Sequence, residues 1–121
     1  MKKNKIIYWI TTGIISLMML FSASMYFTSP QATAGFAHFG FPDYFRIELA
    51  IAKIIGVFIL LIPQIPMRIK EWAYGGFAIV FISASIAHYN SGDPAANIFG
   101  PMVFLIILII SNIYLHEIKE V

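Results

Sequence analysis

Long apolar stretches fill most of this chain, and their lengths constrain the fold more than any other feature. They cover residues 6–28, 42–62, 71–89 and 98–115. An α-helix rises about 1.5 Å per residue, so each stretch approaches or exceeds the roughly 30 Å thickness of the hydrocarbon core of a bilayer. The sequence therefore predicts an all-α membrane protein in which residues 1–121 form one domain, a four-helix transmembrane bundle.

The composition agrees with this prediction and excludes several classes of function. Hydrophobic residues make up 60% of the chain and charged residues 12%, and the mean hydropathy is +0.82. Too few residues lie outside the apolar stretches to form a soluble catalytic domain. The chain contains no cysteine, which rules out disulfides and haem attachment through Cys-x-x-Cys-His. Because catalytic and metal-binding motifs are also missing, we expect no self-sufficient enzyme, no intrinsic cofactor, no metal and no nucleic-acid partner.

The first apolar stretch has an alternative interpretation as a signal peptide. Lys2, Lys3 and Lys5 precede it, and residues 32–34 have the small-x-small form of a cleavage site. The apolar run is longer than the hydrophobic region of most signal peptides, and the small residues lie well beyond it. A membrane-spanning helix is therefore the favoured interpretation.

Prolines, glycines and polar residues mark the connections between the apolar stretches. Residues 29–41 are predicted to form a loop rich in glycine and phenylalanine, with residues 35–41 lying in the membrane interface. Pro63 and Pro66 end the second stretch, and residues 90–94 form a turn. The connections are thus short.

The positions of lysine and arginine predict the orientation in the membrane. If the chain spans four times, the basic residues outside the spans all fall on one side, and neither loop on the opposite side contains any. Tryptophan and tyrosine gather near the ends of the spans, as they do at membrane interfaces. We therefore expect both termini in the cytoplasm. The basic residues on that side are Lys2, Lys3, Lys5, Arg68, Lys70 and Lys119.

Three ionisable residues lie within the second apolar stretch, where charge is costly. Arg46 and Glu48 lie near its outer end, whereas Lys53 lies close to the midplane, about 16 Å from the outer surface. A lysine at the centre of a membrane helix costs about 2.5–3.5 kcal/mol, so we expect it to face the interior or a wet cavity and to have a partner. Glu48 and Lys53 point about 140° apart, which predicts that their partners lie on other helices.

These residues predict a polar pocket that opens to the outer face. Side chains lean toward the N-terminus of their own helix, which raises the Lys53 ammonium toward the depth of Glu48. Two serines and a histidine of the third stretch reach a similar depth. The predicted pocket consists of Lys53, Glu48, Ser83, Ser85 and His88, with Asp93 and Asn97 at its mouth.

Each pocket residue also has a purely structural interpretation. Serines in membrane helices often bond to the backbone or join helices, and a buried pair of Lys53 and Glu48 would fix the packing of the bundle. An interfacial histidine such as His88 can cap a helix end, and Arg46 can extend its side chain to the membrane surface. At the level of the sequence, both interpretations stay open.

Several short motifs give the chain a resemblance to the DoxX-like family of small four-helix membrane proteins. The sharpest is Lys-Glu-Trp-Ala-Tyr at residues 70–74, and others lie at residues 41–45, 53–56, 60–63 and 87–93. The resemblance implies a four-helix bundle in a bacterial cytoplasmic membrane. The positions that match recurring sites of the family are Pro42, Lys53, Gly56, Glu71, Trp72, Tyr74, His88, Gly92 and Asp93.

The resemblance also suggests what the protein does. Some members of the family look like membrane partners of oxidative-stress or thiosulfate–quinone redox systems, and distant ones resemble assembly chaperones. The first hypothesis is therefore an accessory membrane subunit whose pocket holds a quinone, a lipid or a similar amphiphile, with Lys53 and His88 bonding the head group and Glu48 relaying a proton. The second is a non-catalytic module that binds or assembles another membrane protein. The third is a small-solute carrier, which would need a homo-oligomer to build its path.

Overall fold

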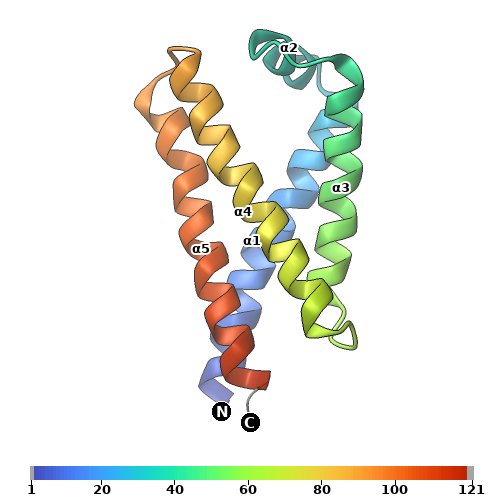
Figure 1. The fold of residues 1–121 in the computed structure, drawn as a ribbon, viewed down its shortest axis with the longest axis vertical. Helices are drawn as coiled ribbons and strands as arrows, with labels where there is room; N and C mark the ends of the chain where they lie inside the picture. Colours follow the sequence, from blue (N-terminus) through green and yellow to red (C-terminus); the bar gives the residue numbers. More distant parts are fainter. Residues whose placement is uncertain (1, 120–121) are drawn as a thin grey trace.

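The protein is described here by a computed structural model that covers residues 2–119, and this part of the chain forms five helices and no strand (Figure 1). The prediction of an all-α fold is confirmed. Helix α1 begins and helix α5 ends at the same end of the molecule (Figure 1). The helices are α1 Lys2–Thr28, α2 Pro30–His38, α3 Asp43–Leu61, α4 Met67–Asn90 and α5 Ala95–Lys119.

Prolines set the starts of three helices. Pro42 and Pro66 are the N-caps of α3 and α4, and their extended backbones lead directly into the first helical turns. The carbonyl of Pro66 accepts bonds from the backbone N–H groups of Ile69 and Lys70, so α4 begins earlier than residue 71, where the apolar stretch starts. Pro94 precedes α5 in the same way. A proline fits here because its fixed φ suits a helix start and the first N–H groups have no partner within the helix.

The segment predicted as a loop contains a short helix, and that prediction is wrong over Pro30–His38. Ser29 has an extended backbone and Pro30 follows at the first position of α2, which is a favourable start for a helix. Alanines then supply strong helix propensity, which outweighs the glycine-rich appearance of the segment.

Helices α2 and α4 end in the same kind of turn. Gly40 and Gly92 have φ values of 82° and 73°, a conformation that glycine adopts without strain. In α2, the N–H of Phe41 bonds the carbonyl of Phe36 at 3.0 Å, and in α4 the N–H of Asp93 bonds the carbonyl of His88 at 3.0 Å. This is the Schellman motif, which brings the residue after the glycine back to the last turn of the helix. It therefore places the Asp93 side chain beside His88.

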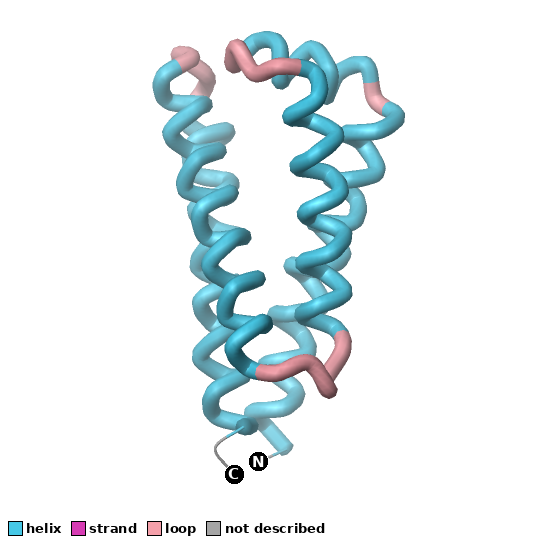
Figure 2. Tube along the Cα trace, turned by 45° about the vertical axis from the view of Figure 1, so that its right-hand side comes forward, coloured by secondary structure: helices cyan, strands magenta, loops and turns pink. Residues whose placement is uncertain are grey.

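The long helices do not pack equally. Helix α1 packs along both α3 and α5, and α4 packs along α5, whereas α3 and α4 touch over a much shorter stretch. Figure 2 shows that α3 and α4 are joined at the end near the termini and diverge toward the other end. The long helices are thus packed in the order α3, α1, α5, α4, and one open seam lies between α3 and α4.

The interior combines an apolar core with several buried polar side chains, and large apolar side chains also cover the outside. Thr12 of α1 and Tyr74 of α4 both bond the hydroxyl of Ser111 on α5, at 2.7 and 2.6 Å, and all three residues are buried. Large apolar side chains are exposed along every long helix, including Leu17 and Ile79. Helices α1 and α5 are long and apolar enough to cross a membrane. This distribution suits a protein dissolved in lipid rather than in water.

In the middle of the seam, α3 presents a glycine to a ring of α4. The buried ring of Phe77 lies directly against Gly56, and a Cβ added at Gly56 would come within 2.5 Å of Phe77 Cζ. Gly56 therefore leaves room for the Phe77 ring to reach α3.

We expect Gly56→Ala to destabilise the protein by about 1–3 kcal/mol, because the new methyl group forces the Phe77 ring to move. The free energy of unfolding in detergent micelles measures this effect. The matched control is Gly75→Ala, where nothing lies within 4 Å of the added Cβ and the better helix propensity of alanine should leave stability equal or higher. Equal losses of stability in the two variants would contradict the close contact between Gly56 and the Phe77 ring.

Candidate functional site

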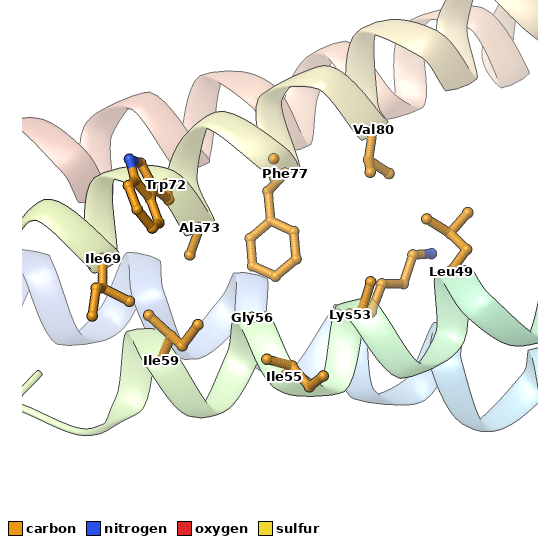
Figure 3. Close-up of a pocket in the computed structure, with 12 residues that line it drawn as sticks. Leu49, Lys53, Ile55, Gly56, Ile59, Ile69, Trp72, Ala73, Phe77 and Val80 are labelled. Carbon is orange, nitrogen blue, oxygen red and sulfur yellow. The ribbon is translucent and has the colours of Figure 1, made fainter.

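A groove runs along the seam between α3 and α4. Its volume is about 420 Å³, and nearly all of the surrounding surface is apolar. Figure 3 shows the Phe77 ring reaching across to Gly56 in the middle, with Trp72 and Ile69 on one side and Lys53, Leu49 and Val80 on the other. The lining residues are Leu49, Ala52, Lys53, Ile55, Gly56, Ile59, Ile69, Trp72, Ala73, Gly76, Phe77 and Val80.

Lys53 is the polar group of this groove, and its partners come from α1. Its Nζ donates to the Ser22 hydroxyl at 2.8 Å and to the Tyr26 hydroxyl at 2.7 Å, and it lies 4.0 Å from the centroid of the Tyr26 ring. The lysine is only 5% exposed. Ser22 and Tyr26 lie one turn apart on α1, so a single face of that helix holds the ammonium group.

The charge of Lys53 is solvated by neutral groups. Among residues 2–119, no carboxylate forms an ion pair with Lys53. An ammonium group has three N–H donors, and the described chain accepts from two of them. The third donor has no hydrogen-bond acceptor in the described chain, and Lys53 lines the groove.

An aromatic chamber of about 260 Å³ continues the groove toward the end of the molecule that carries α2. Leu49 and Val80 line both spaces, and the bond between Lys53 and Tyr26 joins the polar residue of the groove to the wall of the chamber. The rings of Tyr26 and Phe36 pack edge to face in its wall, with 4.9 Å between their centroids. The chamber is lined by Tyr26, Phe36, Phe39, Phe41, Phe45, Leu49, Ile79, Val80, Ser83, Ala84, Ala87 and His88.

Two histidines share one carboxylate above the chamber. Asp93 Oδ2 lies 2.7 Å from His88 Nδ1, and Asp93 Oδ1 lies 3.1 Å from His38 Nε2. The hydrogen bond from His88, followed by that from His38, lowers the pKa of the Asp93 carboxyl below its ordinary value. This cluster connects α2 to the turn between α4 and α5.

The structure does not gather the seven predicted pocket residues into one pocket. Lys53, Ser83 and His88 line the connected groove and chamber, and Asp93 lies beside His88. Ser85 instead bonds the carbonyl of Ile98 at 2.7 Å and joins α4 to α5. It points the other way because Ser83 and Ser85 lie about 200° apart around their helix.

The remaining two predicted pocket residues are exposed. Glu48 lies on the side of α3 that faces away from the Lys53 site, as the angular separation on the helix requires. Asn97 lies in the first turn of α5, where its N–H bonds the carbonyl of Pro94 at 3.0 Å.

Several residues of this region are not identified by the sequence patterns. Ser22 and Tyr26 are missed as ligands of Lys53, although their spacing of one helical turn in the C-terminal half of α1 is a usable signal. The sequence places His38 in a loop, and only the fold brings it to Asp93. Lys70 is predicted only as a topology signal, but its Nζ is buried and donates to the carbonyls of Ile59 and Leu60 at 2.8 and 3.1 Å.

Comparison with known proteins assigns the chain to a family. A family model described as the DoxX-like family matches residues 10–111, a segment that contains the groove, the chamber and the two histidines above it. The chain belongs to the DoxX-like family. Searches of curated proteins and of solved structures found no match. The family resemblance seen in the sequence is therefore confirmed.

The motif positions of this DoxX-like chain serve several purposes in the structure. Glu71 Oε1 accepts bonds from Asn112 and His116 of α5, both at 2.9 Å, next to the exposed Trp72 at one end of the groove. Tyr74 belongs to the buried hydroxyl cluster. The others are the N-cap Pro42, the close-packed Gly56, the turn glycine Gly92, and the groove and chamber residues Lys53, His88 and Asp93.

We expect Tyr26→Phe to cost about 1–3 kcal/mol of stability, because it keeps the ring and removes a hydroxyl bonded to a buried charge. In the Lys53→Met background the same change should cost much less, since no ammonium group is left to lose its acceptor. A double-mutant cycle of unfolding free energies measures this coupling. Tyr44→Phe, at an exposed tyrosine, is the control. Equal costs in both backgrounds would show that the bond contributes nothing.

Proposed function

We propose that this DoxX-like protein crosses a bacterial cytoplasmic membrane four times, with both termini in the cytoplasm. Helices α3 and α4 expose large apolar side chains along their length, among them Ile55, Phe58, Ile82 and Ile86, as α1 and α5 do. The charged residues of α3 are turned inward or lie near its start, which supports a lipid-facing surface on this helix as well. The basic residues near α1 and the start of α4 support the cytoplasmic orientation.

We propose further that the protein is an accessory membrane subunit that holds a quinone or a similar amphiphile between α3 and α4. The observation that carries this proposal is Lys53, a buried ammonium group with a donor to spare at the point where an apolar groove meets an aromatic chamber. A ligand oxygen would satisfy that donor. Ligand sites of this type are mostly apolar, with a few polar groups that fix the orientation.

The shapes of the two spaces favour an amphiphile with a ring-containing head group. The apolar groove suits a hydrocarbon tail, which could enter sideways from the membrane. The chamber offers the edges and faces of five aromatic side chains, which pack well against a flat ring. Lys53 and the Tyr26 hydroxyl would then bond one oxygen of the head group, and His88 lies in the chamber wall within reach of another part of it.

The protein is proposed to act with a partner that carries out the chemistry. Groups of three or more histidine or carboxylate side chains that could hold a metal ion are absent from residues 2–119. The described chain therefore offers binding and positioning groups, and a second membrane or redox protein of an oxidative-stress system would use the bound amphiphile.

An alternative function is the assembly of another membrane protein, and one observation favours it. Small residues, including Ala52, Ala73 and Gly76, line the groove beside Gly56. Small residues allow the backbones of membrane helices to approach closely, so the seam is suited to a helix from a partner or from a second copy of this chain.

We expect native mass spectrometry of the gently extracted protein to detect one bound amphiphile, identified after lipid extraction. In Lys53→Met the bound amphiphile should fall at least tenfold, because a charge-assisted bond to the head group is lost. Lys3→Met, at an exposed lysine, should retain it. If Lys53→Met proves unstable, Tyr26→Phe keeps the charge and should still weaken retention.

Two outcomes would contradict the amphiphile proposal. Undiminished ligand in both Lys53→Met and Tyr26→Phe would mean that the groove does not bind the head group. An empty protein that retains a specific partner protein at fixed stoichiometry would favour the assembly function instead.

A further inference from the structure

A second space lies beyond the aromatic chamber, on the side of α4 near its C-terminus. This vestibule has a volume of about 300 Å³ and is more polar than the groove, with Ser83, Asn90 and Ser91 in its wall. Phe39 and Phe41 line both the vestibule and the chamber. Groove, chamber and vestibule therefore follow one another from the middle of the molecule to the end opposite the termini.

Phe39 stands between the chamber and the vestibule and is held from two sides. Its ring packs edge-on against His88, with centroids 4.9 Å apart. The preceding residue, His38, bonds Asp93, and the same carboxylate bonds His88. Any movement of Phe39 away from the chamber would therefore have to break or strain the cluster of His38, Asp93 and His88.

The two ends of the seam are closed by different means. At the end near the termini, α3 and α4 are linked by residues 62–66, and Lys70 of α4 bonds the last carbonyls of α3. At the other end, the bond between His38 and Asp93 is the hydrogen bond that ties α2 to the α4–α5 turn in the described chain. Opening at this end requires little else to change.

We propose that Phe39 is a door between the chamber and the outer aqueous face, and that His38, Asp93 and His88 form its latch, which holds more firmly when the histidines carry charge. The latch rests on the proposed function in two respects: the chamber it closes is taken to hold the head group of the amphiphile, and the end of the molecule that carries α2 is taken to face the outer aqueous side. The geometry of the door does not depend on the identity of that ligand.

Charge strengthens the latch because both of its hydrogen bonds end on one carboxylate. Histidine side chains ordinarily change charge between about pH 5 and 8, and a charged imidazolium attracts the Asp93 carboxylate as an ion pair, an attraction that a neutral imidazole does not have. The lowered pKa of Asp93 keeps its carboxylate ionised throughout this range, and its contribution is lost only at pH values below the ordinary aspartate range. The latch is therefore tight near pH 6 and looser near pH 8.

Other ionisable groups around the latch do not reverse this expectation. On α3, Arg46 and Asp43 pair with each other at 3.0 Å, and Glu48 is exposed on that helix. The ionisable side chains that α1 and α4 add nearby are Tyr26 and Tyr89, and tyrosine as a residue type ordinarily titrates near pH 10. The first two turns of α5 carry no ionisable side chain. Among these residue types, histidine is the one that ordinarily changes charge between pH 6 and 8.

The absence of native cysteine allows a direct test of the door. Ala84→Cys places one thiol in the chamber wall, and Ala96→Cys places one at an exposed position on the same face as a reference. The full-length variants, reconstituted in liposomes, are reacted with a membrane-impermeant, charged methanethiosulfonate. Dividing the reaction rate of the chamber thiol by that of the reference thiol at each pH removes the effect of pH on thiolate reactivity.

We expect the rate ratio to rise about threefold or more between pH 6 and pH 8 as the latch loosens. Asp93→Asn should give a high ratio at both pH values. His38→Gln keeps a hydrogen-bond donor but cannot acquire charge, so it should flatten the pH dependence. His116→Ala, at the other end of the molecule, should behave as the parent. A ratio that is equal at both pH values in the parent and unchanged in Asp93→Asn would overturn the latch.

This experiment uses no amphiphile, so its failure is distinct from that of the proposed function. A pH-dependent door in a protein whose Lys53→Met variant still binds its amphiphile would support the latch and refute the head-group site. If Lys53→Met loses the amphiphile and the reaction rate ratio does not depend on pH, the head-group site is supported and the latch is refuted.

Discussion

The bonds of Lys53 to Ser22 and Tyr26 determine which helices pack together. A buried ammonium group must find acceptors, since leaving a charge without partners costs several kcal/mol. Both acceptors lie on α1, so α3 is held against α1 rather than against α4. Arg46 adds to this attachment, because its guanidinium donates to the backbone carbonyl of Tyr26 near the end of α1. The open seam between α3 and α4 is therefore a consequence of where the polar groups of α3 find their partners.

Helices α4 and α5 are held together by different chemistry. The hydroxyls of Thr12 and Tyr74 meet at Ser111, so α4 is attached to α5 and through it to α1. Neutral hydroxyl pairs of this kind contribute about 0.6 kcal/mol each on average in membrane proteins, and up to roughly twice or three times that. These bonds matter more for helix orientation than for stability, because each bond fixes the rotation of a helix about its axis. Together with Lys53 they leave α3 and α4 as neighbouring helices that share no polar bond in the middle of the described part of the chain.

The sequence predicted the elements of this fold better than the contacts between them. Apolar length and proline positions predicted the long helices, because both act locally along the chain. Helix angles correctly separated Glu48 from Lys53, but the partners of Lys53 depend on the rotation and order of the helices, which one sequence does not determine. His38 illustrates the same limit, since its partner Asp93 is distant in the chain. The pair of His88 and Asp93, by contrast, follows from a local glycine turn and was recognisable as a motif.

The chemistry of Lys53 also distinguishes between the two occupants proposed for the seam, an amphiphile and a partner helix. A partner helix packed against Gly56 and its small neighbours would bring apolar side chains toward the third N–H of the ammonium group. That donor would then be buried without an acceptor, at a cost of about 1–3 kcal/mol or more for a charged group. A head group with an oxygen at the same place gains a charge-assisted bond instead. A helix could avoid the penalty only by presenting its own acceptor at the depth of Lys53. Of the two occupants that we propose, this chemistry favours the one that is apolar along most of its length and carries an oxygen at one defined point, as an amphiphile does.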